Sequence, residues 1–235
     1  MARGMTFRMR TLAKWHVWLG WLVGVPIVMW LATGLLMVAR PIEEVRGEHL
    51  RREPPPTPLV IPGSALASPE AQLKEMRVVM QRGRAVAILT GLDGSVRRVD
   101  FATGTALPPL DAAAARALVA ERITTGKDVA RVRLFPADQT PFDFRRPLAV
   151  WQVALNDGTN VYVGRDTGEI EAVRTRWWRA FDLAWGLHIM DLSEREDTSH
   201  PILILFAALS LTGAVIGCVL MFRRRRAPPT AAPRA

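Results

Sequence analysis

Two long apolar stretches lie near the ends of the chain, and a polar middle separates them. Residues 15–38 and residues 201–222 contain no Asp, Glu, Lys or Arg. A helix that crosses a bilayer needs about 20 predominantly apolar residues, and both stretches reach that length. The first stretch also exceeds the apolar core of a signal peptide, about 7–15 residues, and no small-residue cleavage pattern follows it. The pattern therefore predicts two transmembrane helices.

The polar middle opens with a proline-rich segment. Residues 39–63 include "RREPPPTPLVIPG", and proline at this density favours the extended polyproline II conformation. We interpret residues 39–63 as a stiff stalk and residues 64–176 as the domain that it carries.

A repeat organises this domain. Residues 93–104 read "DGSVRRVDFATG" and residues 157–168 read "DGTNVYVGRDTG", with Asp-Gly and Thr-Gly at the same spacing. Each copy follows an apolar, β-prone run, and Asp-Gly in that setting is a strong hairpin signal. The sequence thus predicts two related hairpins, with Gly104 and Gly168 in equivalent turns.

The segments around the repeat indicate further strands and a helix. Residues 84–89 and 130–135 are short β-prone runs, and residues 148–155 alternate as a half-buried strand does. Residues 109–123 predict a helix with Asp111 as its N-cap. The apolar positions expected on one side of that helix are Ala113, Ala117, Leu118 and Val119.

A helix followed by antiparallel strands that end in "VYVGRDTGEIEAV" resembles the PepSY domain. The resemblance is good for residues 110–174 and weaker for residues 68–107, where the helix is shortened to "SPEAQLKEM" at 68–76. Beside such a domain, "WHVWLGW…P…TG" in the first apolar stretch is similar to the PepSY-associated transmembrane family. We therefore expect a membrane α plus α+β fold: two transmembrane helices flanking an extracytoplasmic PepSY-like helix/antiparallel-sheet domain with an internal duplication, residues 68–107 and 110–174.

The resemblance also implies a location and a chemistry. Family members of this kind sit in the bacterial inner membrane. Longer members are linked to iron uptake, and some are haem-bearing ferric-siderophore reductases. This chain has fewer predicted spans than those members.

Charge sets the expected orientation in the membrane. The formal net charge is +9, and "RRRR" at 223–226 follows the second span. The first span is preceded by Arg3, Arg8, Arg10 and Lys14. Basic segments beside spans stay in the cytoplasm, so residues 1–14 and 223–235 are expected there and the central domain in the periplasm. The basic composition follows from this topology and does not indicate nucleic-acid binding.

The sequence contains no conventional enzyme motif. It has no G-x-S-x-G, no H-E-x-x-H, no Gly-rich phosphate loop and no flavin fingerprint. It also lacks the C-x-x-C-H that attaches haem covalently. The single cysteine, Cys218, lies in the second span, so the domain has no disulfide. Any redox activity would need electrons from a partner.

His16 lies inside the first span. It shares a helix face with Gly20 and Gly24, because residues four apart stack, and Gly-x-x-x-Gly admits another helix or a flat ring. One interpretation is an axial haem ligand, a neutral imidazole in an apolar slot, which the family resemblance favours. The other is an interfacial histidine within an aromatic belt of tryptophans. His49 lies in a polar stretch, and we interpret it as solvated.

Residues 177–199 form the second notable segment. Trp178, Phe181, Trp185 and His188 recur at helical spacing, which predicts an amphipathic interfacial helix followed by an acidic connector. Three interpretations stay open here: haem binding by His188, alone or with His200; a His/carboxylate metal site; or a solvated hinge. The metal ligands would come from His188, Asp191, Glu194, Glu196, Asp197 and His200.

The thickness of the bilayer limits the haem interpretation. The apolar core is about 30 Å thick. His16 lies near its inner face, whereas His188 and His200 lie near the outer one, so they cannot ligate a single haem together. The second inner ligand would be His16 of another copy, Met9, Met5 or a residue of a different protein.

These observations favour one function and leave an alternative. The favoured function is b-type haem binding that assists electron transfer across the inner membrane, for reduction of iron or another periplasmic acceptor. The alternative is a non-catalytic periplasmic binding or regulatory module anchored in the membrane. Expected partners are the lipid bilayer, an unidentified redox or periplasmic protein, and a second copy. Small-residue faces that favour a homodimer are Gly20 with Gly24 and Gly213 with Gly217.

The charge bias makes the topology testable. A reporter enzyme that is active only in the periplasm should give no signal when it is fused to Ala235, because the basic segments hold both termini in the cytoplasm. The same reporter fused within residues 64–176 should be active. A strong signal from the Ala235 fusion would overturn the orientation.

Overall fold

The computed structural model describes residues 2–53 and 73–224. The chain divides into two compact units. Among the described residues, one unit is formed by residues 2–40 and 180–224 and is mainly helical, and the other is formed by residues 41–53 and 73–179.

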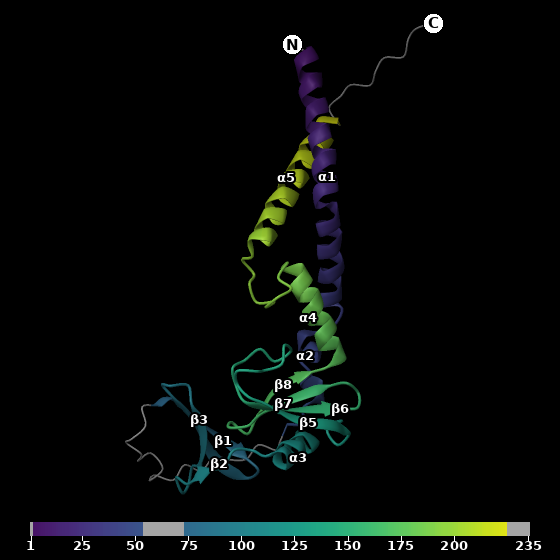
Figure 1. Ribbon diagram of the computed structural model, residues 1–235. Coiled ribbons are helices and arrows are strands. Elements are labelled where there is room, and N and C mark those ends of the chain that lie inside the picture. The colour runs from purple at the N-terminus through teal and green to yellow at the C-terminus, as the bar shows by residue number, and fades with distance from the viewer. Residues whose placement is uncertain (1, 54–72, 225–235) are drawn as a thin grey trace. The chain divides into compact units, whose positions relative to one another are not determined.

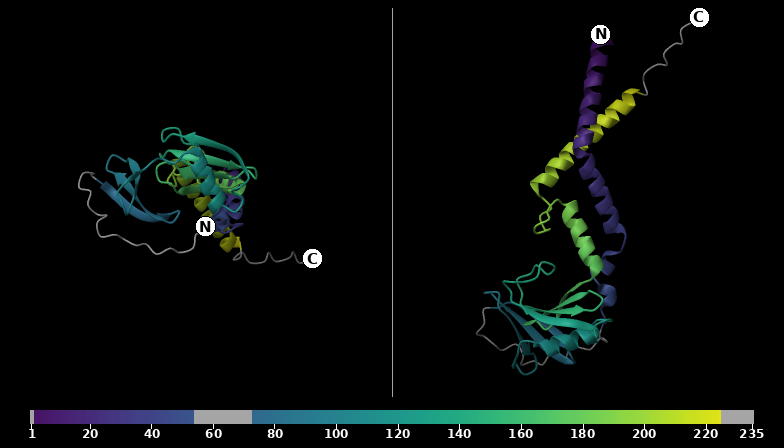
Figure 2. Two further views of the ribbon diagram at one scale, coloured as in Figure 1. Left: turned by 90° about the horizontal axis from the view of Figure 1, so that it is seen from below. Right: turned by 45° about the vertical axis from the view of Figure 1, so that its right-hand side comes forward.

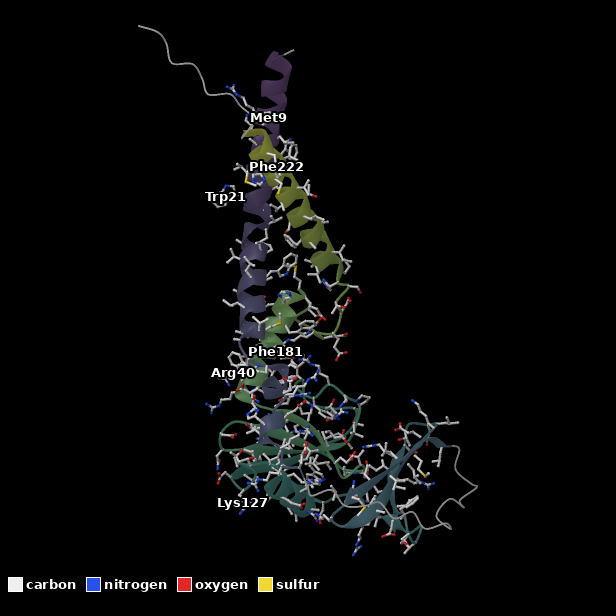
Figure 3. All side chains as sticks on the ribbon, turned by 180° about the vertical axis from the view of Figure 1, so that it is seen from behind. Met9, Trp21, Arg40, Lys127, Phe181 and Phe222 are labelled. Carbon is white, nitrogen blue, oxygen red and sulfur yellow. The ribbon has the colours of Figure 1, made fainter. Side chains whose placement is uncertain are left out.

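The helical unit is built on two long helices, α1 (Ala2–Val38) and α5 (Pro201–Arg224). Within them, Met9–Val38 and Pro201–Phe222 are long and apolar enough to cross a membrane. The two helices pack against each other and cross (Figures 1 and 2). Met9 and Phe222 lie at the same end of the pair (Figure 3), so the start of α1 and the end of α5 are together.

The outer surface of α1 carries large apolar side chains. Trp15, Trp18 and Trp21 are 66%, 76% and 83% exposed, and Trp21 points away from α5 (Figure 3). Exposed tryptophans at this density are unfavourable in water, whereas a bilayer interface accommodates them. The helix pair therefore presents the surface that a membrane-spanning unit needs.

The first sheet of the other unit is an antiparallel meander. Its strands are β1 (Leu73–Gln81), β2 (Arg84–Gly91), β3 (Val96–Asp100) and β4 (Ala106–Leu107), in that spatial order. Its small core is formed by Ala87, Leu89 and Phe101.

The second sheet repeats the same order. Its strands are β5 (Val129–Phe135), β6 (Val150–Leu155), β7 (Asn160–Gly164) and β8 (Ile170–Arg174). Helix α3 (Ala112–Arg122) covers one face (Figure 1). The core between helix and sheet contains Ala115, Val119, Ile123, Val153, Leu155, Val161, Val163 and Val173.

The opposite face of the second sheet is also covered. Phe144, Val150, Tyr162 and Ala172 form a second cluster there. The buried Tyr162 hydroxyl donates a hydrogen bond to Asp143 and accepts one from Gln152 Nε2 at 2.7 Å. Burial and the bond to Asp143 together raise the pKa of Tyr162 above its ordinary value.

The predicted repeat is confirmed in its geometry. Gly94 and Gly158 have φ of 80° and 84°, in the β2–β3 and β6–β7 turns. Gly104 and Gly168 have φ of 71° and 67°, and each donates its N–H to the carbonyl oxygen four residues earlier, at 2.8 and 3.0 Å. The Asp-Gly and Thr-Gly pairs therefore build the same two turns in both sheets.

The predicted helix at 109–123 is present, and Asp111 caps it by accepting from the N–H of Ala114 at 2.7 Å. Its buried face was predicted in part only: Ala115 and Val119 are buried, whereas Ala113 and Ala117 are exposed. The segment was too rich in alanine for periodicity to select the face.

Two predictions need correction, one of a helix and one of a half-buried strand. The helix expected at 68–76 is wrong from Leu73 onward, because these residues pair with β2 as strand β1, and residues 68–72 lie outside the described residues. Strand β6 is not half-buried: Val150 and Val153, on opposite faces, are both fully buried, because α3 covers one face and the Phe144 cluster covers the other.

Part of the segment interpreted as a stalk belongs to the domain. Residues 41–53 form α2 (Ile42–Val45) and the 3₁₀ turn η1 (Glu48–Leu50), and Val45 is buried. Arg51 makes a β-bridge with Ile123, and Leu50 packs on the α3 core. The proline-rich remainder, 54–63, lies outside the described residues.

The two repeat glycines offer a matched pair of substitutions. Gly104→Ala should lower the free energy of unfolding by about 1–2 kcal/mol, the cost of a left-handed Cβ residue. A Cβ at Gly104 would meet no atom within 4 Å, but one at Gly168 would lie 2.5 Å from Arg98 Nη1. Arg98 is held by hydrogen bonds to Gln81 and Pro108, so Gly168→Ala should cost about 1–3 kcal/mol more.

The measurement is denaturant unfolding of the full chain in mild detergent. Equal losses for the two alanine variants would show that Arg98 is free to move away from residue 168.

Candidate functional site

His16 is held at the contact between α1 and α5. Its Nδ1 lies 3.1 Å from the carbonyl oxygen of Gly213. A carbonyl oxygen can only accept, so in the neutral imidazole Nδ1 carries the proton and Nε2 keeps its lone pair. This is the tautomer of a histidine that ligates a metal through Nε2 while Nδ1–H is fixed by a backbone carbonyl.

The room for the His16 ring comes from the glycines of α5. A Cβ at Gly217 would lie 2.9 Å from His16 Cε1, so only glycine fits opposite the ring without displacing it. Gly20 and Gly24, which the sequence places on the face of His16, have no such neighbour within 4 Å. They line an open apolar groove on α1, together with Trp21. Their packing against a second copy stays a prediction.

His188 closes helix α4 (Arg176–His188) and contacts α1. Its Nδ1 lies 3.0 Å from the hydroxyl oxygen of Thr33. The same hydroxyl lies 2.8 Å from the carbonyl oxygen of Met29, and when it donates its one proton there, its oxygen accepts from Nδ1–H of His188. In that arrangement His188 has the same tautomer as His16. Its Cε1 lies 3.7 Å from where a Cβ of Gly34 would be, which is an ordinary van der Waals distance.

Several polar atoms of the helical unit are buried without a hydrogen-bond partner among the described residues. They include Trp30 Nε1, His200 Nδ1 and Ser210 Oγ. The Trp30 ring lies 6.5 Å from that of His188, and Ser210 is one turn before Gly213 on α5. An unsatisfied buried polar group costs about 1–3 kcal/mol.

The two ordered imidazoles lie at different depths. His16 and Thr33 are on the same helix, and seventeen residues at 1.5 Å each separate them by about 25 Å. His16 and His188 therefore cannot act on one ligand, and each would need a second ligand from elsewhere.

The acidic connector is organised internally. Asp191 accepts hydrogen bonds from the backbone N–H groups of Ser193, Glu194, Glu196 and Asp197, at 3.1–3.3 Å. Asp182 on α4 pairs with Arg195, and both side chains are largely buried. Trp185 Nε1 donates to the carbonyl of Arg195 at 3.0 Å. The connector is thus folded onto α4.

This arrangement bears on the metal interpretation. Across residues 2–53 and 73–224, no group of three or more His, Cys, Asp and Glu side chains could hold a metal ion. Both oxygens of Asp191 already accept hydrogen bonds, so the described chain lends no support to a set drawn from His188, Asp191 and His200.

The comparison with protein families now adds a decisive observation. The model of the PepSY-associated TM region matches residues 13–235. The chain belongs to the PepSY-associated TM family. It is a membrane protein with a PepSY domain, as the two apolar helices and the helix-plus-sheet unit indicate. Comparisons with curated proteins and with solved structures found no match.

Sequence reasoning missed three sets of contacts in this PepSY-associated protein. They are the hydrogen bond between Thr33 and His188, the Asp182–Arg195 ion pair, and the cage around Asp191, by which we mean the backbone N–H groups of residues 193, 194, 196 and 197 that bond to its carboxylate. For Asp191 a local signal existed, because Asp-x-Ser favours an Asx-type turn. Thr33 and His188 are 155 residues apart, and no sequence signal joins them.

The cage makes the connector sensitive to acid. Hydrogen bonds from Ser193 and from the backbone N–H groups of Glu194, Asp197 and Glu196 lower the pKa of Asp191 below its ordinary value of 3.8. A depressed pKa in the folded state means that this stability is present above about pH 4 and is lost as the pH falls below it. Unfolding of the full chain in detergent should show an acid-dependent loss of stability that Asp191→Asn makes smaller; Asp93 and Asp197, whose pKa values are also lowered, keep the rest.

Asp138→Asn is the control, because Asp138 is exposed and makes no recorded hydrogen bond within the described ranges. An unchanged acid dependence in the Asp191 variant would contradict the role of the cage.

Proposed function

We propose that this PepSY-associated protein binds b-type haem through His16 and His188 and assists electron transfer across the bacterial inner membrane, for reduction of iron or another periplasmic acceptor. The observation that carries the proposal is the engagement of Nδ1 in both imidazoles. In each ring Nδ1 lies within hydrogen-bonding distance of an oxygen on a neighbouring helix, so Nε2 is the nitrogen left to ligate haem iron.

The surroundings fit such a ligand. Each imidazole is held by one hydrogen bond, and His16 also lies close to Gly217. Such contacts are how a protein sets the orientation of a metal-binding ring. Trp30 Nε1, buried without a partner among the described residues, lies on the ring that neighbours His188. A haem held between two imidazoles takes up and releases one electron.

The two histidines would bind their ligands at different depths in the membrane. His16 would hold a group near the cytoplasmic side and His188 one near the periplasmic side, about 25 Å apart along α1. The apolar side chains of α1 and α5 would exclude water from the region between these two sites. Because the sequence has no flavin or nucleotide motif, a partner protein supplies the electrons.

A second copy is the simplest source of the missing ligands. The groove lined by Gly20, Trp21 and Gly24 is open on α1, and small residues allow helices to approach closely in lipid. In a homodimer, His16 of each copy would serve one site. The common end of Met9 and Phe222 (Figure 3) supports termini on one side of the membrane, and the arginine bias supports the cytoplasmic side.

The test is an absorption spectrum of the protein purified in mild detergent from haem-replete cells. We expect sharp Soret and α bands on reduction, as bis-imidazole b-type haem gives. His16→Ala and His188→Ala should each lower the haem content, because each removes one ligand.

His49→Ala is the matched control, since His49 is exposed and lies outside the helical unit; it should leave the haem content unchanged. A colourless, well-folded wild-type protein would rule out the haem proposal and favour a non-catalytic binding module.

A further inference from the structure

A large cavity opens within the unit of residues 41–179, to which neither His16 nor His188 belongs. Its volume is about 1170 Å³, slightly above the range of about 300–1,000 Å³ that is usual for small-molecule ligand sites. Both sheets contribute to its lining, and so do α3 and residues 46–53. The hydrogen bond from Gln81 Nε2 to the carbonyl of Thr167, at 2.9 Å, joins the two sheets beside it.

The lining is strongly basic. Nine arginines and five glutamates face the cavity, an excess of four positive charges. Glu169 is paired with Arg77, and Glu121 lies 3.9 Å from both Arg82 and Arg122. Part of the acidic charge is therefore already neutralised inside the lining, and the net charge of the lining stays positive.

Arg98 is the unusual member of this set. It is 9% exposed, the most buried arginine of the lining. Its guanidinium donates to Gln81 Oε1 at 3.1 Å and to the carbonyl of Pro108 at 2.7 Å, which are both neutral acceptors. No carboxylate lies within ion-pair distance of it among the described residues, and its buried Nε has no hydrogen-bond partner there.

A buried cation without a carboxylate in direct contact is unfavourable, because burial removes its hydration and hydrogen bonds to neutral acceptors replace that hydration only in part. Burial lowers the pKa of Arg98 from its ordinary value; the more distant negative charge of Asp166 opposes this change, and the charge of Arg82 adds to it. A fold that needed only packing at this position would be better served by an apolar side chain. The position keeps a guanidinium whose free donors match an oxyanion.

We propose that this cavity is a binding site for a small organic anion whose carboxylate or phosphate groups are held by Arg98. The guanidinium gives the planar, multiply donating surface that such groups prefer. The remaining arginines supply the long-range field that draws an anion in. Met80, Val86, Leu107 and Leu118 give the site an apolar wall, which suits a ligand with a carbon skeleton.

The proposal can be tested by calorimetric titration of the full chain in mild detergent. The probes are citrate for carboxylates, inorganic pyrophosphate for phosphates, and trimethyl citrate as an uncharged analogue of the first. We expect citrate or pyrophosphate to bind and trimethyl citrate not to. Arg98→Gln should weaken the binding of the anion by about tenfold or more, because a buried charge-assisted contact is lost.

Arg97→Gln is the matched control. Arg97 precedes Arg98 in β3, its side chain is exposed, and it is not part of the cavity lining, because adjacent strand residues point to opposite faces. Its loss removes the same net charge and should change the affinity by no more than about twofold.

If Arg98→Gln fails to fold, Arg84→Gln is the second test variant. Arg84 lines the cavity from an exposed position, so its substitution should weaken binding of the anion more than Arg97→Gln does. Equal losses in the lining and control variants, or no binding of either anion, would overturn the proposal. These results do not depend on haem, so they leave the electron-transfer proposal untouched.

Discussion

The arrangement of the helical unit depends on one contact, the close approach of α5 to α1 at Gly213 and Gly217. It brings a backbone carbonyl to within 3.1 Å of His16 Nδ1 and places the imidazole ring against a backbone that carries no Cβ. Helices in a bilayer gain little from apolar contact alone, and small residues and interhelical hydrogen bonds hold them together. The same contact therefore packs the helices and fixes one proton on one ring nitrogen.

The second histidine, His188, is also held by a hydrogen bond between its Nδ1 and an oxygen of a neighbouring helix, here the hydroxyl of Thr33. The Thr33 hydroxyl lies within hydrogen-bonding distance of a carbonyl oxygen of its own helix and of His188 Nδ1. The connector that follows is kept in place by the Asp182–Arg195 pair and by the cage around Asp191. The chain thus orders one imidazole near each end of the apolar pair, and it does so with neutral partners that a low-dielectric environment favours.

Local chemistry predicted much of this fold. The length of the two apolar stretches predicted α1 and α5, and Asp111 predicted the start of α3. The Asp-Gly and Thr-Gly pairs predicted the turns at Gly94, Gly104, Gly158 and Gly168. Each of these signals acts within a few residues. The prediction failed where tertiary pairing overrode local preference, as at residues 73–76, where pairing with β2 replaces the expected helix.

The candidate site was predictable only in part. His16 and His188 could be singled out as histidines in apolar settings, but their partners Gly213 and Thr33 lie 197 and 155 residues away. Arg98 gave no sequence signal at all, because arginine is ordinarily exposed and only the packing of two sheets buries it. Contacts that close over such distances are set by the fold as a whole.

The central claim is that the ordered imidazoles are haem ligands. Electron paramagnetic resonance of the oxidised protein, purified in mild detergent from haem-replete cells, addresses it most directly, since the signal reports the axial ligands themselves. The account predicts the low-spin ferric signal of haem held between two imidazoles. A haem-free protein, or haem whose signal is high-spin or shows non-histidine axial ligation, would contradict it.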